Sequence, residues 1–595
     1  MFTTRPELSG TFGMVASTHW LASAAGMKAL EAGGTAADAA VTAGLVLCVV
    51  EPHLNGLLGD MPLLVWPCGD DAPVVLCGQG PAPRRATVEH YRSEGLEMIP
   101  GAGLLSTVIP GAFGAWMTLL RDHGRLELAE VMAPAIFYAA KGHPLLANVC
   151  NSISANAAMF KSEWPSSADV WLPNGEAPSP GGLFCNPQLA DTLQRIVNEA
   201  AGAPDRGARI EAARRAVYSG FVAEKIDTYL SKSCVMDGTG VRRKGVLDGQ
   251  DMAHWQASYE VPVSVEVSGW KIWKPGPWSQ GPSLLQALRV LDSAGIENCP
   301  QGSPDFVHLV VEALKLAFAD REAYYGDPDH SDIPLAQLLS HPYASRRAGL
   351  ITRGASHDLR SGGVPGFEMQ IQAFEKRANA QLPKHTGYGG GEPTMAHLSN
   401  AEGDTVHLDV VDQWGNMVCA TPSGGWLQSN PVIPGLGAPL NTRAQMFWLD
   451  PTIPSGLAPG RRPRTTLSPS MARAPDGRKI AFGTPGGDQQ DQWQLIFLLR
   501  LMHGDRNMQE AIDLPLFHTG HLQASFYPHG VRLGHLMIEP GFSESTIQDL
   551  RERGHSVEVS QPWSVGRLTA VAQGLDGILK AAATPRLMQA YAVGR

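Results

Sequence analysis

Thr405 could take part in chemistry because a polar, glycine-rich stretch ends there and a strand-like pattern begins. Residues 405–412 alternate between polar and apolar side chains, which predicts a strand with one buried face. A chain that cuts itself between Asp404 and Thr405 leaves a threonine with a hydroxyl nucleophile and its own α-amino base. The pKa of such an amine, about 7.7 to 8.0, suits a general base at neutral pH. The local pattern is also that of an ordinary strand that begins with threonine.

Two consecutive glycines, Gly486 and Gly487, stand between a strand-like segment, 479–483, and a helix-like segment, 493–503. Paired glycines let successive backbone N–H groups converge on one point, as an oxyanion hole requires. A tight turn, or an anion site of the phosphate-binding kind, is the alternative. Neither GxxxxGKS/T nor a strand-linked GxGxxG occurs, and this favours the oxyanion hole over phosphate binding.

Three arginines, Arg461, Arg462 and Arg464, lie directly before two hydroxyl residues, Thr465 and Thr466. The cluster is a candidate part of the same site. A solvated patch of surface charge is the alternative interpretation.

Composition and motifs exclude several other classes of function. Neither HExxH nor GxSxG occurs, the nineteen histidines do not cluster as metal ligands, and the eight cysteines form no CxxC pair, so we expect no metal and no cofactor. The net charge of −10 is spread without long runs, which predicts no nucleic-acid partner. The first residues lack the features of a secretory signal, and no uncharged stretch reaches membrane-spanning length. We therefore expect a cytoplasmic enzyme that acts on a small molecule and has no membrane partner.

The elements that must position these residues differ along the chain, with helices first and strands second. Residues 36–50 are apolar almost all round, which predicts a core helix, and residues 306–325 predict a long scaffold helix. The irregular turn at 275–282 is of a kind that often lines sites, although a plain connection is the alternative. Residues 353–404 lack a regular pattern and predict a processed linker. A hairpin turn is expected at 412–416.

Taken together, the sequence resembles the γ-glutamyltransferase family of N-terminal nucleophile hydrolases over nearly its whole length. The resemblance lies in many blocks that occur in family order: 13–17, 33–41, 50–53, 110–111, 138–142, 319–321, 404–407, 412–416, 462–469 and 483–487.

This resemblance implies an α/β (α+β) fold, the four-layer αββα sandwich, formed by one self-cleaved precursor. Cleavage between Asp404 and Thr405 would give a helix-rich large chain, 1–404, and a strand-rich small chain, 405–595, that stay together as a heterodimer. A dimer of such heterodimers is an open alternative.

The resemblance also implies roles for single residues of the catalytic core. Thr405 matches the nucleophile, and Ser423 matches a second hydroxyl residue that hydrogen-bonds it. Gly486 and Gly487 match the oxyanion-hole pair. Thr465 and Thr466 match a serine pair that contacts the carboxylate of the acyl donor.

The donor pocket departs from the family pattern. Family members hold a γ-glutamyl head group with an arginine, an aspartate and polar amides, and these positions correspond here to Gln79 (arginine), Gly425 (asparagine), Arg443 (glutamine or glutamate) and Met446 (aspartate). A buried ammonium without its partner costs about 1 to 3 kcal/mol, so Met446 argues against recognition of an α-amino group. Arg443 favours a carboxylate. Arg84 or Arg85 is a candidate substitute for the missing arginine.

The expected function is hydrolysis of γ-glutamyl amides such as glutathione, with transfer of the acyl group to water or an amine. The alternative substrate is an amide whose acyl group has a carboxylate but no α-amine, of the glutaryl or oxamate type. An alternative of another class is a non-catalytic, unprocessed relative that binds a ligand.

Overall fold

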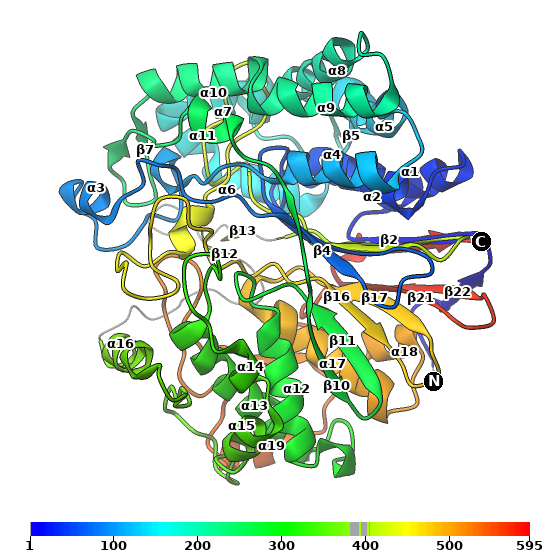
Figure 1. Cartoon of the computed structure of the whole chain (residues 1–595), viewed down its shortest axis with the longest axis vertical. Coiled ribbons are helices and arrows are strands. Elements are labelled where there is room, and N and C mark those ends of the chain that lie inside the picture. The colour runs from blue at the N-terminus through cyan, green and yellow to red at the C-terminus, as the bar shows by residue number, and fades with distance from the viewer. Residues whose placement is uncertain (1, 381–391, 394–401, 404) are drawn as a thin grey trace.

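The computed structural model describes residues 2–380, 392–393, 402–403 and 405–595. Asp404, on one side of the predicted scissile bond, lies outside the described residues, as do residues 381–391 and 394–401 of the predicted linker. Two stacked sheets fill the middle of the molecule, and helices cover them from above and below (Figure 1).

One sheet contains the strand that follows Thr405. Its order is β23-β2-β14-β15-β3-β4-β9, and all neighbouring strands are antiparallel. The bounds are β2 Gly13–Ser17, β3 Met61–Trp66, β4 Val74–Gly78, β9 Ser258–Glu260, β14 Leu408–Asp412, β15 Met417–Ala420 and β23 Tyr591–Gly594. The predicted hairpin turn is confirmed, because the Asp412 N–H donates to the Asn416 carbonyl at 3.1 Å.

The other sheet carries the glycine pair at the end of one of its strands. Its order is β1-β22-β21-β17-β16-β11-β10, again with antiparallel neighbours. The bounds are β1 Leu8–Gly10, β10 Val263–Val267, β11 Trp270–Lys274, β16 Ser470–Arg473, β17 Lys479–Gly483, β21 Thr569–Gln573 and β22 Leu579–Ala583. Both sheets take strands from before and after Thr405. Helices α1–α16 (residues 20–378) precede Thr405 and only α17–α19 (residues 490–552) follow it, which agrees with the expected helix-rich first part and strand-rich second part, although strands of the first part complete both sheets.

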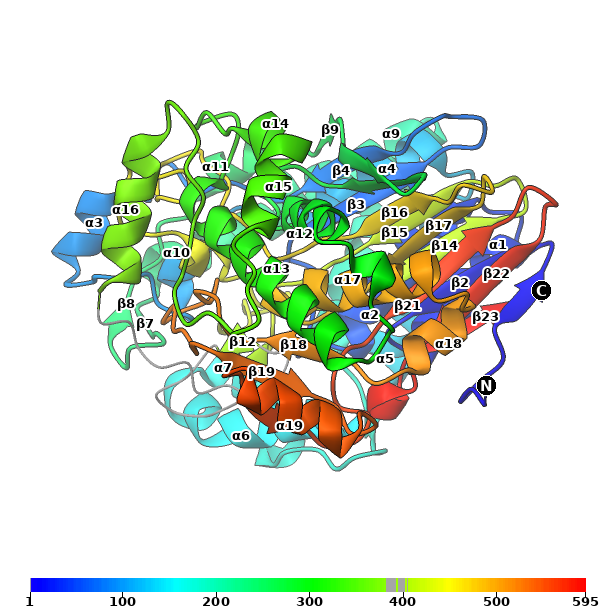
Figure 2. The ribbon, with the colours of Figure 1, turned by 90° about the horizontal axis from the view of Figure 1, so that it is seen from below.

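Three hydrophobic layers hold the four structural layers together. Between the sheets, apolar side chains from both inner faces interdigitate, among them Trp66, Trp273 and Met471. On the outer face of the β14 sheet pack α1 Trp20–Glu31, α2 Ala36–Val50 and α4 Ala112–His123. Every residue of α2 is buried, which confirms the predicted core helix. The outer face of the β17 sheet is covered by α12 Pro282–Ser293, α13 Pro304–Tyr324, α17 Gln490–His503 and α18 Met508–Asp513 (Figure 2). The predicted αββα sandwich is thus confirmed.

The remaining elements extend the two helical layers. Beside α1, α2 and α4 lie α3 Val88–Ser93, α5 Leu128–Lys141, α6 Ala147–Glu163, α7 Pro165–Trp171, α8 Pro187–Ala200, α9 Arg206–Tyr218, α10 Phe221–Lys232 and α11 Gly249–Ala253, with the short pairs β5 His143–Pro144 and β6 Leu183–Phe184, and β7 Val235–Met236 and β8 Arg242–Arg243. On the other side lie α14 Leu335–Leu338, α15 His341–Ala348, α16 Glu368–Ala378, α19 Glu544–Glu552 and a three-stranded sheet of β18 Phe517–Thr519, β19 His535–Ile538 and β20 Ser556–Val559. A last pair joins β12 Glu392–Pro393 to β13 Glu402–Gly403.

Two local expectations, about regular structure and about burial, are wrong, whereas the processing of residues 353–404 stays a prediction. The 353–404 segment contains a regular helix, α16, whose Phe374 is buried against a cluster that includes Tyr324. Residues 405–412 are buried on both faces, because the second sheet covers the face that was expected to meet solvent.

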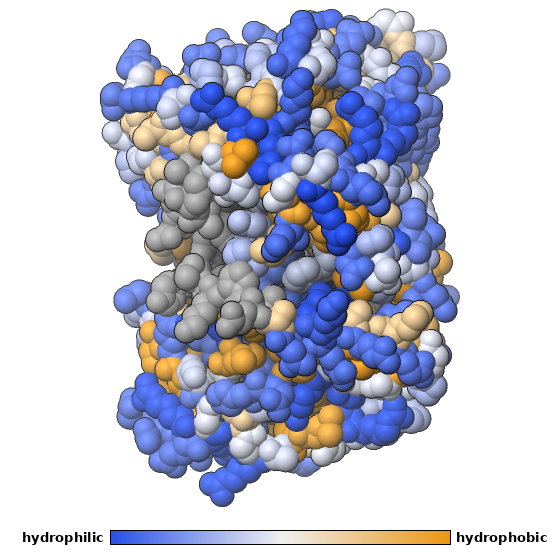
Figure 3. All heavy atoms as spheres, turned by 90° about the vertical axis from the view of Figure 1, so that its left-hand side faces the viewer, coloured by the Kyte–Doolittle hydropathy of each residue, from blue (hydrophilic) through white to orange (hydrophobic). Residues whose placement is uncertain are grey.

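The face seen in Figure 3 is covered mainly by hydrophilic side chains, with hydrophobic ones scattered among them. Within the described parts of the chain, no helix has the length and apolar character that crossing a membrane requires.

Candidate active site

Thr405 lies directly opposite Ser423, at the point where the β14–β15 hairpin runs out of regular pairing. The hairpin pairs Leu408 with Ala420, so three further steps along each strand bring residues 405 and 423 face to face. The Thr405 hydroxyl donates to Ser423 Oγ at 3.3 Å, and both residues are fully buried. The structure thus brings together the predicted nucleophile and its predicted hydroxyl partner.

A row of polar side chains continues from Thr405 along the inner face of the sheet. The His407 ring contacts Thr421 Oγ1 through Nδ1 at 2.9 Å and Asp409 Oδ1 through Nε2 at 3.1 Å. An ionised Asp409 carboxylate can only accept, so Nε2 of a neutral ring donates to it and Nδ1 accepts from the threonine hydroxyl. Thr569 of the second sheet donates to the other Asp409 oxygen at 2.7 Å. Sequence analysis did not single out His407 or Asp409. The signal was present, since polar residues at every second position of a fully buried strand need partners.

The His407 ring also explains why glycine ends β17. A Cβ built on Gly483 would lie 2.2 Å from His407 Cε1, so a larger residue there would push the sheets apart at the candidate site.

The glycine pair lies in the tight connection from β17 to α17. Gly486 has a φ of +128° and Gly487 a φ of +54°, a region that glycine enters without steric cost. A Cβ on Gly486 would also lie 2.2 Å from the Trp493 ring. The turn is therefore specified by both glycines, as a preorganised oxyanion hole requires.

A buried relay of side chains holds this turn. Gln280 donates from Nε2 to the Gly487 carbonyl at 3.1 Å and accepts from Arg321 Nη1 at 2.7 Å. Arg321 also contacts Asp488 Oδ1 at 2.6 Å. Burial acts to raise the pKa of Asp488, but the Arg321 charge and hydrogen bonds from Ser525 outweigh it and hold this pKa below its usual value. The irregular turn at 275–282 therefore lines the candidate site, as one of its two interpretations predicted.

The long helix α13 contributes Arg321 to the candidate site. We expected a scaffold helix, but its C-terminal end carries Arg321, which is fully buried against the glycine turn. The ADR block at 319–321 was noted only as a point of family resemblance. Three consecutive charged residues at 320–322, near the end of a helix rich in apolar residues, were the available signal.

The first of the two threonines after the arginine cluster is hydrogen-bonded through its backbone to the irregular turn at 275–282. The Thr465 N–H donates to the Trp278 carbonyl at 2.7 Å, and its carbonyl accepts from Gln280 N–H at 2.9 Å. The Thr466 hydroxyl is buried and has no hydrogen-bond partner among the described residues. Such a hydroxyl costs about 1 to 3 kcal/mol unless a ligand satisfies it, which makes Thr466 a good candidate for a substrate contact.

The three arginines themselves are not a solvated patch. Arg461, Arg462 and Arg464 are 8%, 8% and 2% exposed, so the surface-charge interpretation is wrong. Arg462 pairs with Asp327 at 2.7 Å, and Arg464 pairs with Glu322. Burial of Arg462 and Arg464 is possible because each meets a carboxylate from the end of α13 or the loop after it, whereas Arg461 donates to the backbone carbonyls of Ile453 and Gly456.

Arg443 already has a protein carboxylate as its partner. Its Nε lies 2.8 Å from Asp60 Oδ2, and its Nη2 lies 3.2 Å from Oδ1, with both residues buried. Asp60 in turn exchanges backbone hydrogen bonds with Ser423 at 2.9 and 3.0 Å. The Arg443–Asp60 pair therefore stands next to the Thr405–Ser423 pair. Burial raises the pKa of Asp60, and the Arg443 charge opposes that rise.

Apolar side chains surround the Arg443 guanidinium. Its central carbon lies 5.4 Å from the Trp426 ring centre and 5.8 Å from that of Phe526. The Met446 sulfur lies 3.9 Å from Arg443 Nη1. Sequence analysis placed Arg443 and Met446 together but missed Asp60, because that contact spans 383 residues.

The other two predicted pocket residues, Gln79 and Gly425, line cavities of their own. Gln79 follows β4, is buried, and lines a cavity of about 180 Å³ together with Arg462. Gly425 lies in the loop after Ser423, where it lines a small buried cavity with Asn55. The candidate substitutes for the missing arginine, Arg84 and Arg85, have partners of their own.

Both Arg84 and Arg85 have side chains more than half exposed. Arg84 pairs with Asp248 and Asp251 at the start of α11, and Arg85 Nε donates to the Val246 carbonyl. Both guanidinium groups are therefore engaged by groups close to α11.

Comparison with known proteins places these features in a family. The model of the family described as Gamma-glutamyltranspeptidase matches residues 22–594. The Glutathione hydrolase-like YwrD proenzyme of Bacillus subtilis (strain 168) is 30% identical over 582 residues, covering 97% of both chains. The Oxamate amidohydrolase proenzyme of Klebsiella pneumoniae is 30% identical over 586 residues, also covering 97% of both.

Solved structures agree with the sequence relatives. The structure of LmbA2991T421A is 50% identical, covers 100% of both chains and superposes with a TM-score of 0.92. The cephalosporin acylase from Bacillus halodurans is 28% identical, covers 100% of this chain and 97% of its own, and has a TM-score of 0.80. Together with the αββα fold and the threonine at the head of β14, these matches show that the chain belongs to the gamma-glutamyltranspeptidase family of enzymes.

Proposed function

We propose that this chain is a self-processing N-terminal threonine amidohydrolase or acyltransferase. The observation that carries the proposal is the Thr405 hydroxyl, buried 3.3 Å from Ser423 Oγ at the start of the strand. The names of the two curated relatives, both proenzymes, also support processing. Large and small chains would remain together, because each sheet takes strands from both.

Self-cleavage would begin with attack of the Thr405 hydroxyl oxygen on the carbonyl carbon of Asp404. The peptide C–N bond breaks, the nitrogen takes up the hydroxyl proton, and an ester remains at the threonine. Water then hydrolyses this ester, which leaves a new carboxylate on the large chain and a free α-amino group on Thr405.

In the mature enzyme, the Thr405 amine accepts the hydroxyl proton while the oxygen attacks the substrate amide. The N–H groups of Gly486 and Gly487 would stabilise the oxyanion, with Ser423 orienting the nucleophile. The leaving amine departs with a proton, and the acyl group passes from Thr405 to water or to an acceptor amine. Thr465 and Thr466 would contact the acyl group.

We propose that the acyl group lacks an α-amine. An α-ammonium at the position of the family aspartate would meet the Met446 thioether and the Arg443 guanidinium, while the nearby carboxylate, Asp60, is already paired. Repulsion and lost solvation would both oppose it. γ-Glutamyl amides are therefore the weaker candidate, and amides with a carboxylate-bearing acyl group of the glutaryl or oxamate type are the stronger.

A direct comparison of substrates tests this. Mature enzyme would be assayed with γ-glutamyl and glutaryl p-nitroanilides and with oxamate, and Thr405→Ala would serve as the inactive control. We expect higher kcat/KM for a substrate without the α-amine. A preference for the γ-glutamyl anilide would contradict this choice of donor, and failure on all three would leave neither substrate class supported.

The non-catalytic alternative predicts a single chain that never matures and turns over none of these amides. A cytoplasmic location, and a dimer of heterodimers, stay predictions.

A further inference from the structure

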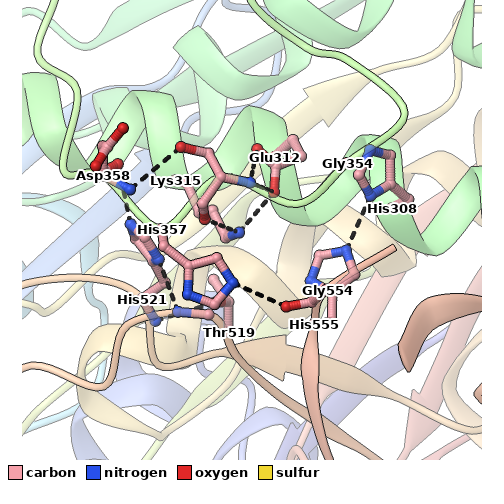
Figure 4. A network of polar contacts seen from close by, with 12 residues as sticks. His308, Glu312, Lys315, Gly354, His357, Asp358, Thr519, His521, Gly554 and His555 are labelled. Carbon is pink, nitrogen blue, oxygen red and sulfur yellow. Dashed lines mark hydrogen bonds and ion pairs between the residues drawn. The ribbon is translucent and has the colours of Figure 1, made fainter. Parts of the chain in front are cut away.

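His308, Glu312 and His555 meet in a buried cluster outside the candidate active site (Figure 4). His308 and Glu312 lie on α13 one turn apart, so their side chains share a face of the helix. His555 comes from the turn between α19 and β20. The possible ligand atoms of the three side chains all lie within 4.8 Å of one another, and the residues are 2%, 1% and 4% exposed.

The hydrogen bonds of His308 direct a nitrogen lone pair into this cluster. Its Nε2 lies 2.7 Å from the Thr352 carbonyl oxygen, which can only accept, so Nε2 carries the proton. Nδ1 is then unprotonated and faces His555 Nε2 at 2.9 Å. A histidine that donates one N–H to a backbone carbonyl while its other nitrogen faces a ligand is the usual arrangement in metal sites.

We propose that His308 Nδ1, His555 Nε2 and a Glu312 carboxylate oxygen bind a divalent transition-metal ion, with Zn²⁺ as the best match. Two imidazoles and one carboxylate, with water as the fourth ligand, form a common zinc donor set. Zinc–nitrogen bonds of about 2.0 to 2.1 Å place tetrahedral ligands about 3.3 Å apart, so the two rings need to separate by only about 0.4 Å. The neutral His555 ring moves its proton from Nε2 to Nδ1, which has no partner among the described residues.

Two cations pair with Glu312 in the structure. Lys315 Nζ lies 2.5 Å from Oε1, and Arg360 Nη2 lies 3.2 Å from Oε2. Both have an alternative, because Lys315 also donates to the Ser356 carbonyl at 2.9 Å and the Arg360 side chain is 26% exposed. Lys315 and a metal ion would therefore compete for the same carboxylate. Removing the lysine charge should therefore strengthen metal binding at this cluster. The same substitution should not change the binding of a metal ion elsewhere on the surface.

The cluster spans the two chains that processing would create. His308 and Glu312 precede Thr405 and His555 follows it, while neighbouring contacts join the same segments: Ala355 N–H to the Arg553 carbonyl at 2.7 Å, and His357 Nε2 to the Gly554 carbonyl at 2.8 Å. A metal here would fasten the large chain to the small one. This consequence rests on the proposed self-cleavage, whereas the metal site itself does not.

Calorimetric titration of the metal-free full-length chain with ZnCl₂ tests the site. The wild type and the unprocessed Thr405→Ala variant should each bind one ion with a Kd of about 1 μM or tighter. His308→Ala and His555→Ala should weaken binding by at least about 100-fold, and His254→Ala, which removes an exposed histidine directly after α11, should leave it unchanged. Lys315→Gln should tighten binding several-fold. Circular dichroism of the metal-free variants would check that they are folded.

Three results would overturn the proposal. One is a wild-type chain that binds no zinc. Another is binding that survives both histidine substitutions, and the third is weaker binding by Lys315→Gln. Because Thr405→Ala is included, failure of self-processing and failure of the metal site give different results. In the processed protein, zinc should also raise the Tm of the wild type but not that of His555→Ala.

Discussion

Ser423 lies directly across the strand pair from Thr405, with 3.3 Å between their hydroxyl oxygens. The hairpin turn at 412–416 sets the register that pairs Leu408 with Ala420, and three residues beyond this pair the chain reaches a hydroxyl residue on each side. The proposed nucleophile is therefore positioned by strand register, which is one of the more rigid relationships a protein can build.

Removing the Ser423 hydroxyl should slow catalysis while leaving the fold intact. Ser423→Ala deletes one neutral hydrogen bond to the proposed nucleophile, worth about 0.5 to 1.5 kcal/mol, so kcat/KM should fall about 2- to 12-fold. Ser423→Thr keeps the hydroxyl and should remain close to the wild type. Steady-state kinetics on the preferred anilide would check this, and equal activity of Ser423→Ala would remove the role assigned to that hydroxyl.

Disturbing Gln280 should lower kcat with little change in KM. Gln280 donates to the Gly487 carbonyl and accepts from Arg321, so it positions the proposed oxyanion hole without touching the substrate. In Gln280→Ala, a small shift of the glycine turn should reduce kcat by about 10- to 100-fold. Gln280→Glu can still accept from Arg321 but cannot donate to Gly487, so it should lose kcat too. A rise in KM at constant kcat would assign Gln280 to substrate binding instead.

Breaking the Arg443–Asp60 pair on one side should destabilise the chain strongly. Arg443→Gln leaves the Asp60 carboxylate buried beside a neutral partner, which should cost about 3 to 5 kcal/mol. The double variant Arg443→Gln/Asp60→Asn should recover much of that loss. Urea unfolding in the unprocessed Thr405→Ala background would measure both. If the single and double variants lost the same stability, the pair would not be coupled.

Glu51, at the end of α2, should make stability depend on pH. Burial raises its pKa from 4.5 to about 7, with hydrogen bonds from Thr18 and Gln589 and the Arg567 charge opposing the rise. The folded chain thus binds more protons at Glu51 than the unfolded chain between these two values. Stability must therefore fall as pH rises from about 4.5 to about 7, by up to about 3 kcal/mol.

Glu51→Gln removes this titration. Relative to the wild type, the variant should gain stability between pH 5 and pH 8, whereas the exposed-site control Glu89→Gln should show no such gain. The free energy of unfolding would be measured by urea titration at each pH. Parallel pH profiles for the wild type and Glu51→Gln would show that Glu51 ionises normally.

Much of the fold was predictable because its signals are local. The apolar run of α2, the hairpin at 412–416 and the strand at 479–483 depend on residues that are neighbours in sequence, and all three were confirmed. The helix α16 was not predicted, because the glycine and proline residues around it indicate an irregular segment and it buries only Phe374.

The site was predictable only in part, because its supporting contacts are long-range. Asp60 meets Arg443, and Gln280 meets Gly487, across separations of 383 and 207 residues, and no sequence periodicity reports such contacts. The burial of both faces of 405–412 likewise depends on a second sheet that the local alternation cannot reveal. The family resemblance predicted the candidate site residues, whereas their hydrogen-bond and ion-pair partners became known only from the structure.

A denaturing gel of the purified protein, with mass spectrometry of its bands, tests the central claim most directly. The wild type should yield two fragments whose new ends lie between Asp404 and Thr405, and Thr405→Ala should remain a single chain. A wild type that stays whole after prolonged incubation, or a Thr405→Ala variant that is still cut at this bond, would contradict the assignment of Thr405 as the nucleophile.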